Sequence, residues 1–375
     1  MKKAIFSIII ASFFLFPIKV NAVSAESYIV MDAESGETLY ESNADEQMLI
    51  ASTTKIMTAL VAIEQSDLKD KVKITAESAD VEGSSMYLEE GDILTLEQLL
   101  YGMMLVSGND AATAVACHVA GSVEEFADLM NDKAEELGLE NTSFTNPHGL
   151  DHEEHYSTAR DMAVLMANAM ENEDFARIAS TKSITIGGLT YTNHNKLLWS
   201  CEGITGGKTG YTKAAGRTLV SCCERDGMRL ICVTLNDPDD WDDHNALYNQ
   251  AFEEYKRITV VDSSENYTEL SVVAGKSDSV GVRAKETVTI VVKADDEVEI
   301  IESLPQFVYA EITEGETAGC ITWSINGEQS GTVELVYTEN VERQNAEDKD
   351  FFNELKEKLM GFVEHYLNRF GYYGS

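Results

Sequence analysis

Positive charge is what this sequence has least of. Its 375 residues include 28 Lys and Arg against 65 Asp and Glu, a net charge of −37 at pH 7. Binding to nucleic acid is therefore not expected, because contacts to phosphates need clustered Lys and Arg. Hydrophobic residues make up 44% and charged residues 25%, which is typical of a globular protein. The length fits one large domain and a smaller one, and we attribute the acidic charge to solubility.

Long apolar runs are also scarce, and the one candidate lies at the N-terminus. Lys2-Lys3 precede the apolar run Ala4–Phe16, and small residues suited to cleavage follow, ending at Ala22 or at Ala25. The run is short for a bilayer span. Residues 1–25 are therefore predicted to be a signal peptide, and the mature protein is expected to be secreted and to act outside the cytoplasm.

The sequence has no Cys-x-x-Cys pair, so a cysteine-based zinc site is not expected. Its six cysteines include three in a predicted hairpin, whose register places Cys223 opposite Met228 and Cys232 opposite Leu219. Adjacent Cys222 and Cys223 point to opposite faces of a strand. Buried free thiols are favoured over a disulfide, which remains the alternative.

A His-Glu-x-x-His motif is missing as well. His152 and His155 are three residues apart, whereas two zinc-binding histidines on one helix face need a spacing of four. Together with His148 they lie in a predicted loop, and we interpret them as surface histidines. A zinc peptidase remains the alternative, and no metal or other cofactor is expected.

Strand patterns flank a helical middle within residues 26–260. A helical periodicity covers much of residues 95–170, and alternating residues at both ends predict strands. The other predicted elements are Ser27–Asp32, Glu37–Tyr40, Ser52–Glu64, Ser183–Tyr191, a strand around Lys208, a hairpin ending at Leu235 and a helix over Asp240–Tyr255. The simplest architecture is an α/β (α+β) domain in which one antiparallel sheet is flanked by helices and carries a helical insertion.

The last third of the chain has a different pattern. Residues 261–345 contain short apolar strands between turn residues, which predict a small β-sandwich-like domain. Residues 346–375 predict an amphipathic helix with an apolar face formed by Phe351, Leu355, Leu359, Phe362, Tyr366 and Phe370. We expect this face to hold the protein on the membrane surface, because so acidic a body is not attracted to anionic lipid. Packing on the β domain is the alternative.

Ser52-Thr53-Thr54-Lys55 begins a helix with an apolar stripe. Ser52 and Lys55 are three residues apart and therefore share a helix face. A serine hydroxyl becomes a good nucleophile when an adjacent base takes its proton, and a lysine is such a base only when it is neutral. Burial and a second nearby cation favour the neutral form. Taken alone, the pattern is better explained by a capping serine with a surface lysine.

Two further motifs follow along the chain. Ser107-Gly108-Asn109 lies where one predicted helix ends and another begins, so its hydroxyl and amide can face a substrate. Lys208-Thr209-Gly210 lies on a predicted strand along which a peptide could add as a further strand. Glycine in a strand often marks the close approach of a ligand. The N–H of the next residue, Tyr211, would pair with the Ser52 N–H as an oxyanion hole.

The three motifs, in this order, match the signature of class A β-lactamases and penicillin-binding proteins. The chain resembles the low-molecular-mass penicillin-binding proteins, the serine-type D-alanyl-D-alanine carboxypeptidases. Other segments similar to that family are Gly83–Met86, His148–Asp151, His155–Ala159 and Leu197–Trp199. The resemblance covers nearly the whole mature chain. It implies a β-lactamase/DD-peptidase-like fold, peptidoglycan peptides ending in D-Ala-D-Ala as substrates, and β-lactam antibiotics as inhibitors.

The resemblance also implies catalytic roles for three residues. Ser52 forms the acyl-enzyme, Lys55 is the general base, and Ser107 relays the proton to the leaving D-alanine.

It implies substrate-binding roles for three others. Asn109 holds the substrate backbone, Thr209 binds the terminal carboxylate, and Lys208 supplies electrostatic help and lowers the pKa of Lys55. Gly210 and Tyr211, on the same predicted strand as Lys208 and Thr209, are the remaining predicted substrate-binding residues.

Two departures from the family pattern concern the substrate carboxylate. Some relatives have an arginine where this chain has His194, and the stretch Asp237–Asp243 is acidic where relatives offer a carboxylate-binding arginine. Arg217 is a weak substitute.

Two other functions share these motifs. A class A β-lactamase would need a Glu-x-x-Leu-Asn run, and Glu136–Asn141 misplaces the Asn by one residue. A β-lactam sensor without turnover would usually carry a membrane signalling segment.

Overall fold

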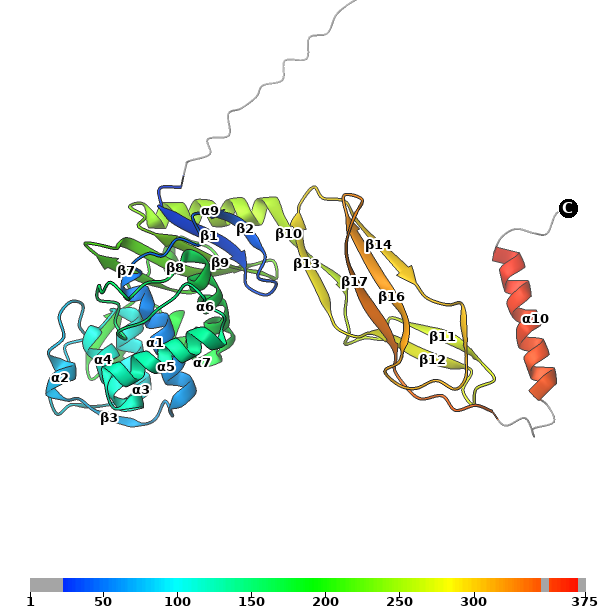
Figure 1. Cartoon of the computed structure of the whole chain (residues 1–375), viewed down its shortest axis with the longest axis horizontal. Coiled ribbons are helices and arrows are strands. Elements are labelled where there is room, and N and C mark those ends of the chain that lie inside the picture. Colours follow the sequence, from blue (N-terminus) through cyan, green and yellow to red (C-terminus); the bar gives the residue numbers. More distant parts are fainter. Residues whose placement is uncertain (1–22, 345–350, 370–375) are drawn as a thin grey trace, which may run out of the picture.

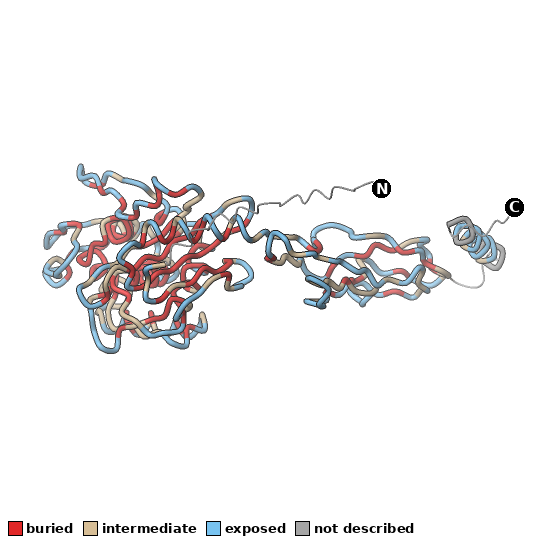
Figure 2. Tube along the Cα trace, turned by 90° about the horizontal axis from the view of Figure 1, so that it is seen from above, coloured by how far each residue is buried: buried red, intermediate tan, exposed pale blue. Residues whose placement is uncertain are grey.

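The structure, a computed structural model, describes residues 23–344 and 351–369, and within the last helix it describes the side chains of residues 355–365. Figure 1 shows a large domain of helices and strands, an elongated β domain and a C-terminal helix beyond it. The large domain holds most of the buried residues (Figure 2).

The large domain consists of nine strands and ten helical segments. Its strands are β1 (Ser27–Asp32), β2 (Thr38–Ser42), β3 (Lys71–Lys73), β4 (Ile93–Thr95), β5 (Ser183–Ile186), β6 (Leu189–Thr192), β7 (Ile204–Thr212), β8 (Gly216–Arg225) and β9 (Met228–Leu235). Its helical segments are η1 (Ala51–Thr54), α1 (Lys55–Gln65), α2 (Ala76–Ala79), α3 (Leu96–Leu105), α4 (Asn109–Ala120), α5 (Val123–Glu136), α6 (Ala159–Glu171), α7 (Glu173–Ala179), α8 (Leu197–Ser200) and α9 (Asp240–Glu254).

The central sheet is antiparallel, with the strand order β2-β1-β9-β8-β7. Both of its faces are buried because successive side chains alternate between two hydrophobic cores. On β1, Ile29 and Met31 belong to the core shared with α1 and α6, whereas Val30 belongs to the core shared with α9. On β9, Leu230 and Cys232 face α9 in the same way. The predicted antiparallel sheet flanked by helices is confirmed.

Side-chain caps fix where the helices of the insertion begin. The Thr95 hydroxyl accepts a hydrogen bond from the Gln98 backbone N–H, and the Gln98 side chain accepts one from Thr95 in return. Ser122 and Thr158 cap α5 and α6 through their hydroxyls. These caps supply partners for backbone N–H groups that a helix start leaves unpaired.

The predicted register of the β8–β9 hairpin is wrong by two residues. Cys223 pairs with Leu230, not with Met228, and Cys232 pairs with Ser221, not with Leu219. The strands continue to a two-residue turn, Asp226-Gly227, because both turn residues take the positive φ that a tight hairpin turn needs. The six cysteines are free, and Cys222 and Cys223 belong to opposite cores as expected.

The second domain is built from eight strands around a third hydrophobic core. They are β10 (Tyr255–Val261), β11 (Thr268–Val273), β12 (Ser279–Ala284), β13 (Val288–Lys293), β14 (Val298–Ser303), β15 (Phe307–Tyr309), β16 (Thr317–Ile325) and β17 (Glu328–Tyr337). Six form a sheet in the order β14-β16-β17-β12-β11-β15, and β10 pairs with β13 in a second, two-stranded sheet. The chain leaves α9 directly into β10, so the two domains are joined without a separate linker.

The C-terminal helix α10 (Phe351–Arg369) follows the β domain. Within its described side chains, Phe362 packs edge-to-face on Phe307 at 5.6 Å, and Lys358 forms an ion pair with Asp278. Leu359 and Val363 remain more than half exposed. Phe351, Tyr366 and Phe370 of the predicted apolar face lie outside the described side chains.

Candidate active site

Ser52 lies in the short helical turn η1, which runs directly into α1. The turn is braced by two threonines, because Thr53 Oγ1 donates to the Ile50 carbonyl at 2.6 Å and Thr54 Oγ1 donates to the Ala51 carbonyl at 2.8 Å. Ala51 has a φ of 48°, a strained value for a residue with a side chain. The turn therefore holds Ser52 in a conformation that a regular helix would not provide.

His155 supports this turn from below, and its interpretation as a surface histidine is wrong. The side chain is buried because the loop containing it folds back to pair Ser143 with Tyr156. Its Nδ1 accepts from the Thr145 N–H at 3.1 Å, so the ring proton is on Nε2, 2.8 Å from Thr54 Oγ1. Burial lowers the pKa of His155 to about 4, which keeps the ring neutral.

Lys55 lies directly beneath Ser52 and is fully buried. Its Nζ is 3.0 Å from Ser52 Oγ, 2.8 Å from Asn109 Oδ1 and 2.6 Å from the His148 carbonyl oxygen. Burial, and then the charge of Lys208, lower the pKa of Lys55 well below its usual value. The structure thus places a lysine that readily becomes neutral within hydrogen-bond distance of the serine hydroxyl.

The second motif lies between α3 and α4, as the sequence predicts. Ser107 has a φ of 62° and is nearly buried, with its hydroxyl turned toward Lys208. The Asn109 amide is held by the protein itself, because Oδ1 accepts from Lys55 and Nδ2 donates to the Glu82 carbonyl at 2.7 Å.

Lys208, on β7, is the second buried lysine of the site. Its Nζ donates to Ser107 Oγ at 3.1 Å and to the Thr209 carbonyl at 2.9 Å. Burial lowers the pKa of Lys208 to about 7. Two lysines in one dry site repel each other when both are charged, so the arrangement favours the loss of a proton from one of them.

The glycine at position 210 is required by close packing. A Cβ added at Gly210 would lie 2.9 Å from the Ser52 backbone nitrogen and 2.3 Å from Thr218 Oγ1. Only glycine lets β7 approach the nucleophile this closely. β7 is also the last strand of the sheet, so its outer edge is open to an extended peptide.

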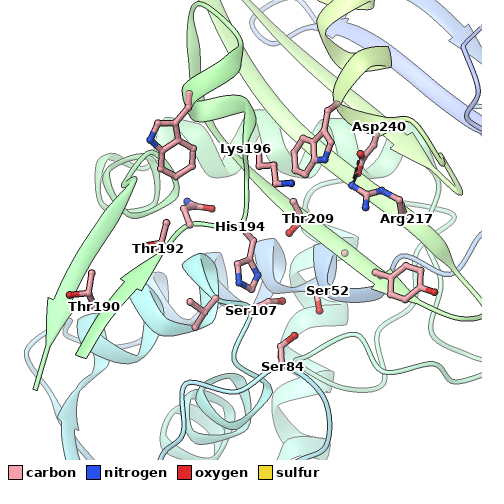
Figure 3. A pocket seen from close by; sticks show the side chains of 16 residues that line it. Ser52, Ser84, Ser107, Thr190, Thr192, His194, Lys196, Thr209, Arg217 and Asp240 are labelled. Carbon is pink, nitrogen blue, oxygen red and sulfur yellow. Dashed lines mark hydrogen bonds and ion pairs between the residues drawn. The ribbon is translucent and has the colours of Figure 1, made fainter. Parts of the chain in front are cut away.

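The site opens into a groove of about 900 Å³ (Figure 3). Of the predicted site residues, Ser52, Ser107, Thr209, Gly210 and Tyr211 line it. Lys55, Asn109 and Lys208 lie buried behind its wall. The structure therefore brings all eight predicted residues together.

Arg217 is the arginine of this groove. It lies on β8, the strand next to β7, and is the register partner of Tyr211. Its Nη2 donates to both carboxylate oxygens of the buried Asp240, at 2.6 and 2.8 Å, and its guanidinium lies over the Trp241 ring. The predicted departure at Asp237–Asp243 therefore supplies a carboxylate that positions this arginine.

Sequence reasoning gave Lys196, Trp199 and Trp241 no role in the site. All three line the groove together with His194, which it had named only as a departure from the family pattern. Trp199 had a signal, because it lies in the segment Leu197–Trp199 that resembles the family. The His148 carbonyl that binds Lys55 had none, since any residue supplies a carbonyl.

Comparison with known proteins identifies this arrangement. A family model described as D-alanyl-D-alanine carboxypeptidase matches residues 16–239, and a model for the C-terminal domain of penicillin-binding protein 5 matches residues 255–343. This chain belongs to the D-alanyl-D-alanine carboxypeptidase family. The predicted family, fold and enzyme class are confirmed.

Several characterised members of this carboxypeptidase family are similar over most of the chain. The carboxypeptidase DacF of Bacillus subtilis is 32% identical, with 82% of this chain and 83% of DacF covered. DacC of Escherichia coli is 34% identical, with 87% and 86% covered. The crystal structure of penicillin-binding protein 5 from Haemophilus influenzae superimposes with a TM-score of 0.74 at 30% identity, covering 86% of this chain and 98% of that one.

The position of Glu136 does not support the β-lactamase that the sequence left open. Glu136, the carboxylate considered for a β-lactamase, forms an ion pair with Lys133 at 3.0 Å and is not among the residues that line the groove. Within the described residues, no three His, Cys, Asp or Glu side chains are grouped to hold a metal ion.

Proposed function

We propose that this carboxypeptidase removes the terminal D-alanine from peptidoglycan pentapeptides through an acyl-enzyme on Ser52. The contact that carries the proposal is the 3.0 Å separation of Lys55 Nζ and Ser52 Oγ. A neutral amine has two N–H bonds, which Asn109 Oδ1 and the His148 carbonyl accept at the two shorter distances. Its lone pair is then left for the Ser52 hydroxyl proton, which is the geometry of a general base.

Ser107 and Lys208 suit the second half of the reaction. Once Ser52 has attacked the carbonyl of the penultimate D-alanine, the leaving amine needs a proton. The Ser107 hydroxyl, hydrogen-bonded to Lys208, faces the groove and can deliver one. Asn109, buried behind the groove wall, then acts chiefly by holding Lys55 in place.

The negative charge that develops on the attacked carbonyl oxygen needs donors. The Ser52 backbone nitrogen packs against β7 at Gly210, next to Tyr211, and we assign the backbone N–H groups of Ser52 and Tyr211 as the oxyanion hole. A peptide added along the free edge of β7 would bring its carbonyl to this point.

We further propose that the terminal carboxylate binds between Thr209 and Arg217. Both line the groove, and Asp240 holds one nitrogen of the guanidinium while leaving its other face exposed. In this proposal Arg217 binds the substrate carboxylate, a role for which the sequence offered it only as a weak substitute.

Replacing Arg217 with Ala should lower kcat/KM for peptides ending in a free carboxylate by about 10–100-fold, since a charge-assisted hydrogen bond contributes about 1.5–3 kcal/mol. Hydrolysis of the matching peptide with a C-terminal amide should change much less. An Arg217→Ala/Asp240→Asn variant avoids leaving a buried carboxylate unpaired and should show the same pattern. An unchanged carboxylate-to-amide ratio would assign Arg217 a purely structural role.

Incubating purified protein with pentapeptide muropeptides tests the proposed reaction. Mass spectrometry should show the loss of one alanine per peptide, continuing over many turnovers. A single acylation by β-lactam without any alanine release would instead support the sensor function.

We propose that the protein is secreted and held at the outer face of the cytoplasmic membrane. The charged and apolar N-terminal residues support export. Among the helices of residues 23–344 and 351–369, none is long and apolar enough to cross a bilayer. Attachment would therefore depend on α10, whose Leu359, Met360 and Val363 are all more than half exposed.

Deleting Phe351–Ser375 should release an active, soluble enzyme from membranes that retain the full-length mature protein. Phe362 and Lys358 contact the β domain, whereas Leu359, Met360 and Val363 are more than half exposed, so we expect the truncated domains to keep their Tm. Fractionation of both forms, followed by activity and melting measurements, checks this. A soluble full-length protein, or a truncation with a much lower Tm, would make α10 a packing element.

A further inference from the structure

A second polar cluster lies where the chain enters the large domain. The Ser24 backbone N–H donates to Asp243 Oδ2 at 2.6 Å, and the Ser24 hydroxyl lies 2.7 Å from Asp237 Oδ1 and 2.8 Å from Asp243 Oδ2. Asp237 is fully buried and Asp243 nearly so. Val23, the preceding residue, packs on the same core as β1 and α9.

The hydrogen bonds of this cluster are incomplete. One hydroxyl proton of Ser24 cannot serve both carboxylates, and Asp237 Oδ2 is buried without a hydrogen-bond partner among the described residues. Burial, and to a lesser degree the charge of Asp243, raise the pKa of Asp237 to about 6. Two adjacent buried carboxylates are costly unless a cation or further donors compensate them.

The neighbouring ionisable groups do not supply that cation. Arg217 is bonded to Asp240. Burial lowers the pKa of His244 to about 3, so its ring is neutral, and burial keeps the Cys232 thiol protonated by raising its pKa.

We propose that signal peptidase cleaves after Ala22 and that the α-ammonium group created on Val23 is bound by Asp237 and Asp243. Water adds across the peptide bond between residues 22 and 23, Ala22 leaves with the new carboxylate, and the Val23 amine takes up a proton. Only two bonded carbons separate that nitrogen from the Ser24 nitrogen, so a free amine there can turn toward the carboxylates that Ser24 already contacts. It supplies three donors and a positive charge beside Asp237, whose Oδ2 has no hydrogen-bond partner among the described residues.

The alternative cleavage after Ala25, which the sequence allows equally, would remove Ser24 and leave both carboxylates without it. Glu26 would then be the first residue, and its nitrogen already has another partner, because the Glu26 N–H donates to the Leu235 carbonyl at 3.2 Å. The structure thus distinguishes two sites that small-residue patterns do not.

Binding of the mature N-terminus would also brace the groove. The Asp237 N–H donates to the Arg217 carbonyl at 2.9 Å, and Asp240 holds the Arg217 side chain. The inference rests on the proposed secretion but not on the catalytic assignments, so D-alanine release and N-terminal docking can fail independently.

The first test is the mature N-terminus itself. Full-length chain secreted by a host with signal peptidase should begin at Val23, as shown by intact mass and N-terminal sequencing. A mature protein that begins at Glu26 would overturn the proposal.

The second test asks whether the amine is bound. Mature protein beginning at Val23 is compared with the same protein acetylated at its N-terminus, which removes the charge. Acetylation should lower the Tm by about 2–4 °C, the shift that about 1 kcal/mol causes in domains of 150–250 residues.

A matched pair of variants separates binding from general charge effects. In Asp239→Asn, which changes an exposed neighbouring carboxylate, acetylation should lower the Tm as in the parent. In Asp237→Asn the effect should largely disappear. Equal Tm shifts in both variants, or no shift in the parent, would show that the N-terminus is not docked, whether or not the enzyme is active.

Discussion

Ser52→Ala should abolish both D-alanine release and covalent labelling by a fluorescent penicillin. The β-lactam carbonyl would be attacked as a mimic of the D-Ala-D-Ala amide, so both reactions depend on the same hydroxyl. Loss of a catalytic nucleophile typically costs at least about 10⁴-fold in rate. Alanine release by mass spectrometry and labelling after electrophoresis measure the two effects.

Ser66→Ala is a suitable control, because Ser66 caps the other end of α1 and is not among the groove residues. It should keep both activities. The Ser52 variant should also keep a Tm close to that of the parent, since the hydroxyl it loses is one of three partners of Lys55. Labelling that persists in Ser52→Ala would identify another nucleophile and refute the proposed acyl-enzyme.

The pairing of Ser52 with Lys55 follows from spacing, whereas the roles of the other site residues were expected from the family resemblance. Ser52 and Lys55 share a helix face because they are three residues apart, and the structure keeps them at 3.0 Å even though the serine lies in a tighter turn. The alternation on β1 and β8 likewise predicts which residues face which core. Both patterns depend only on residues close together in the sequence, so local backbone geometry is enough to predict them.

The features that were missed depend on contacts between distant segments. His155 is buried because its loop folds under Thr54, 101 residues earlier, and no local pattern indicates this. The hairpin register was wrong because it depends on which two residues form the turn, and several turns fit the same alternation. Arg217 was named from the sequence only as a weak substitute for a carboxylate-binding arginine. Only the approach of α9 shows that Asp240 positions it.

Lys208→Ala should lower the rate of acylation by on the order of 100-fold or more while leaving the fold intact, as expected when a preorganised donor is lost from such a site. Two effects combine. The transition state loses a nearby positive charge, and Ser107 loses the partner that orients its hydroxyl at 3.1 Å. Stopped-flow acylation by a chromogenic β-lactam measures the rate.

The pH profile separates Lys208 as an electrostatic group from Lys208 as a packing residue. The charge of Lys208 helps to lower the pKa of Lys55, so removing it should raise that pKa. Lys55 would then become neutral only at higher pH, and the acidic limb of the acylation profile should move upward. Lys213→Ala, an exposed lysine just beyond β7, should change neither the rate nor the profile. A slower Lys208→Ala enzyme whose acidic limb stays in place would mean that Lys208 acts through Ser107 and the substrate, and does not tune the general base.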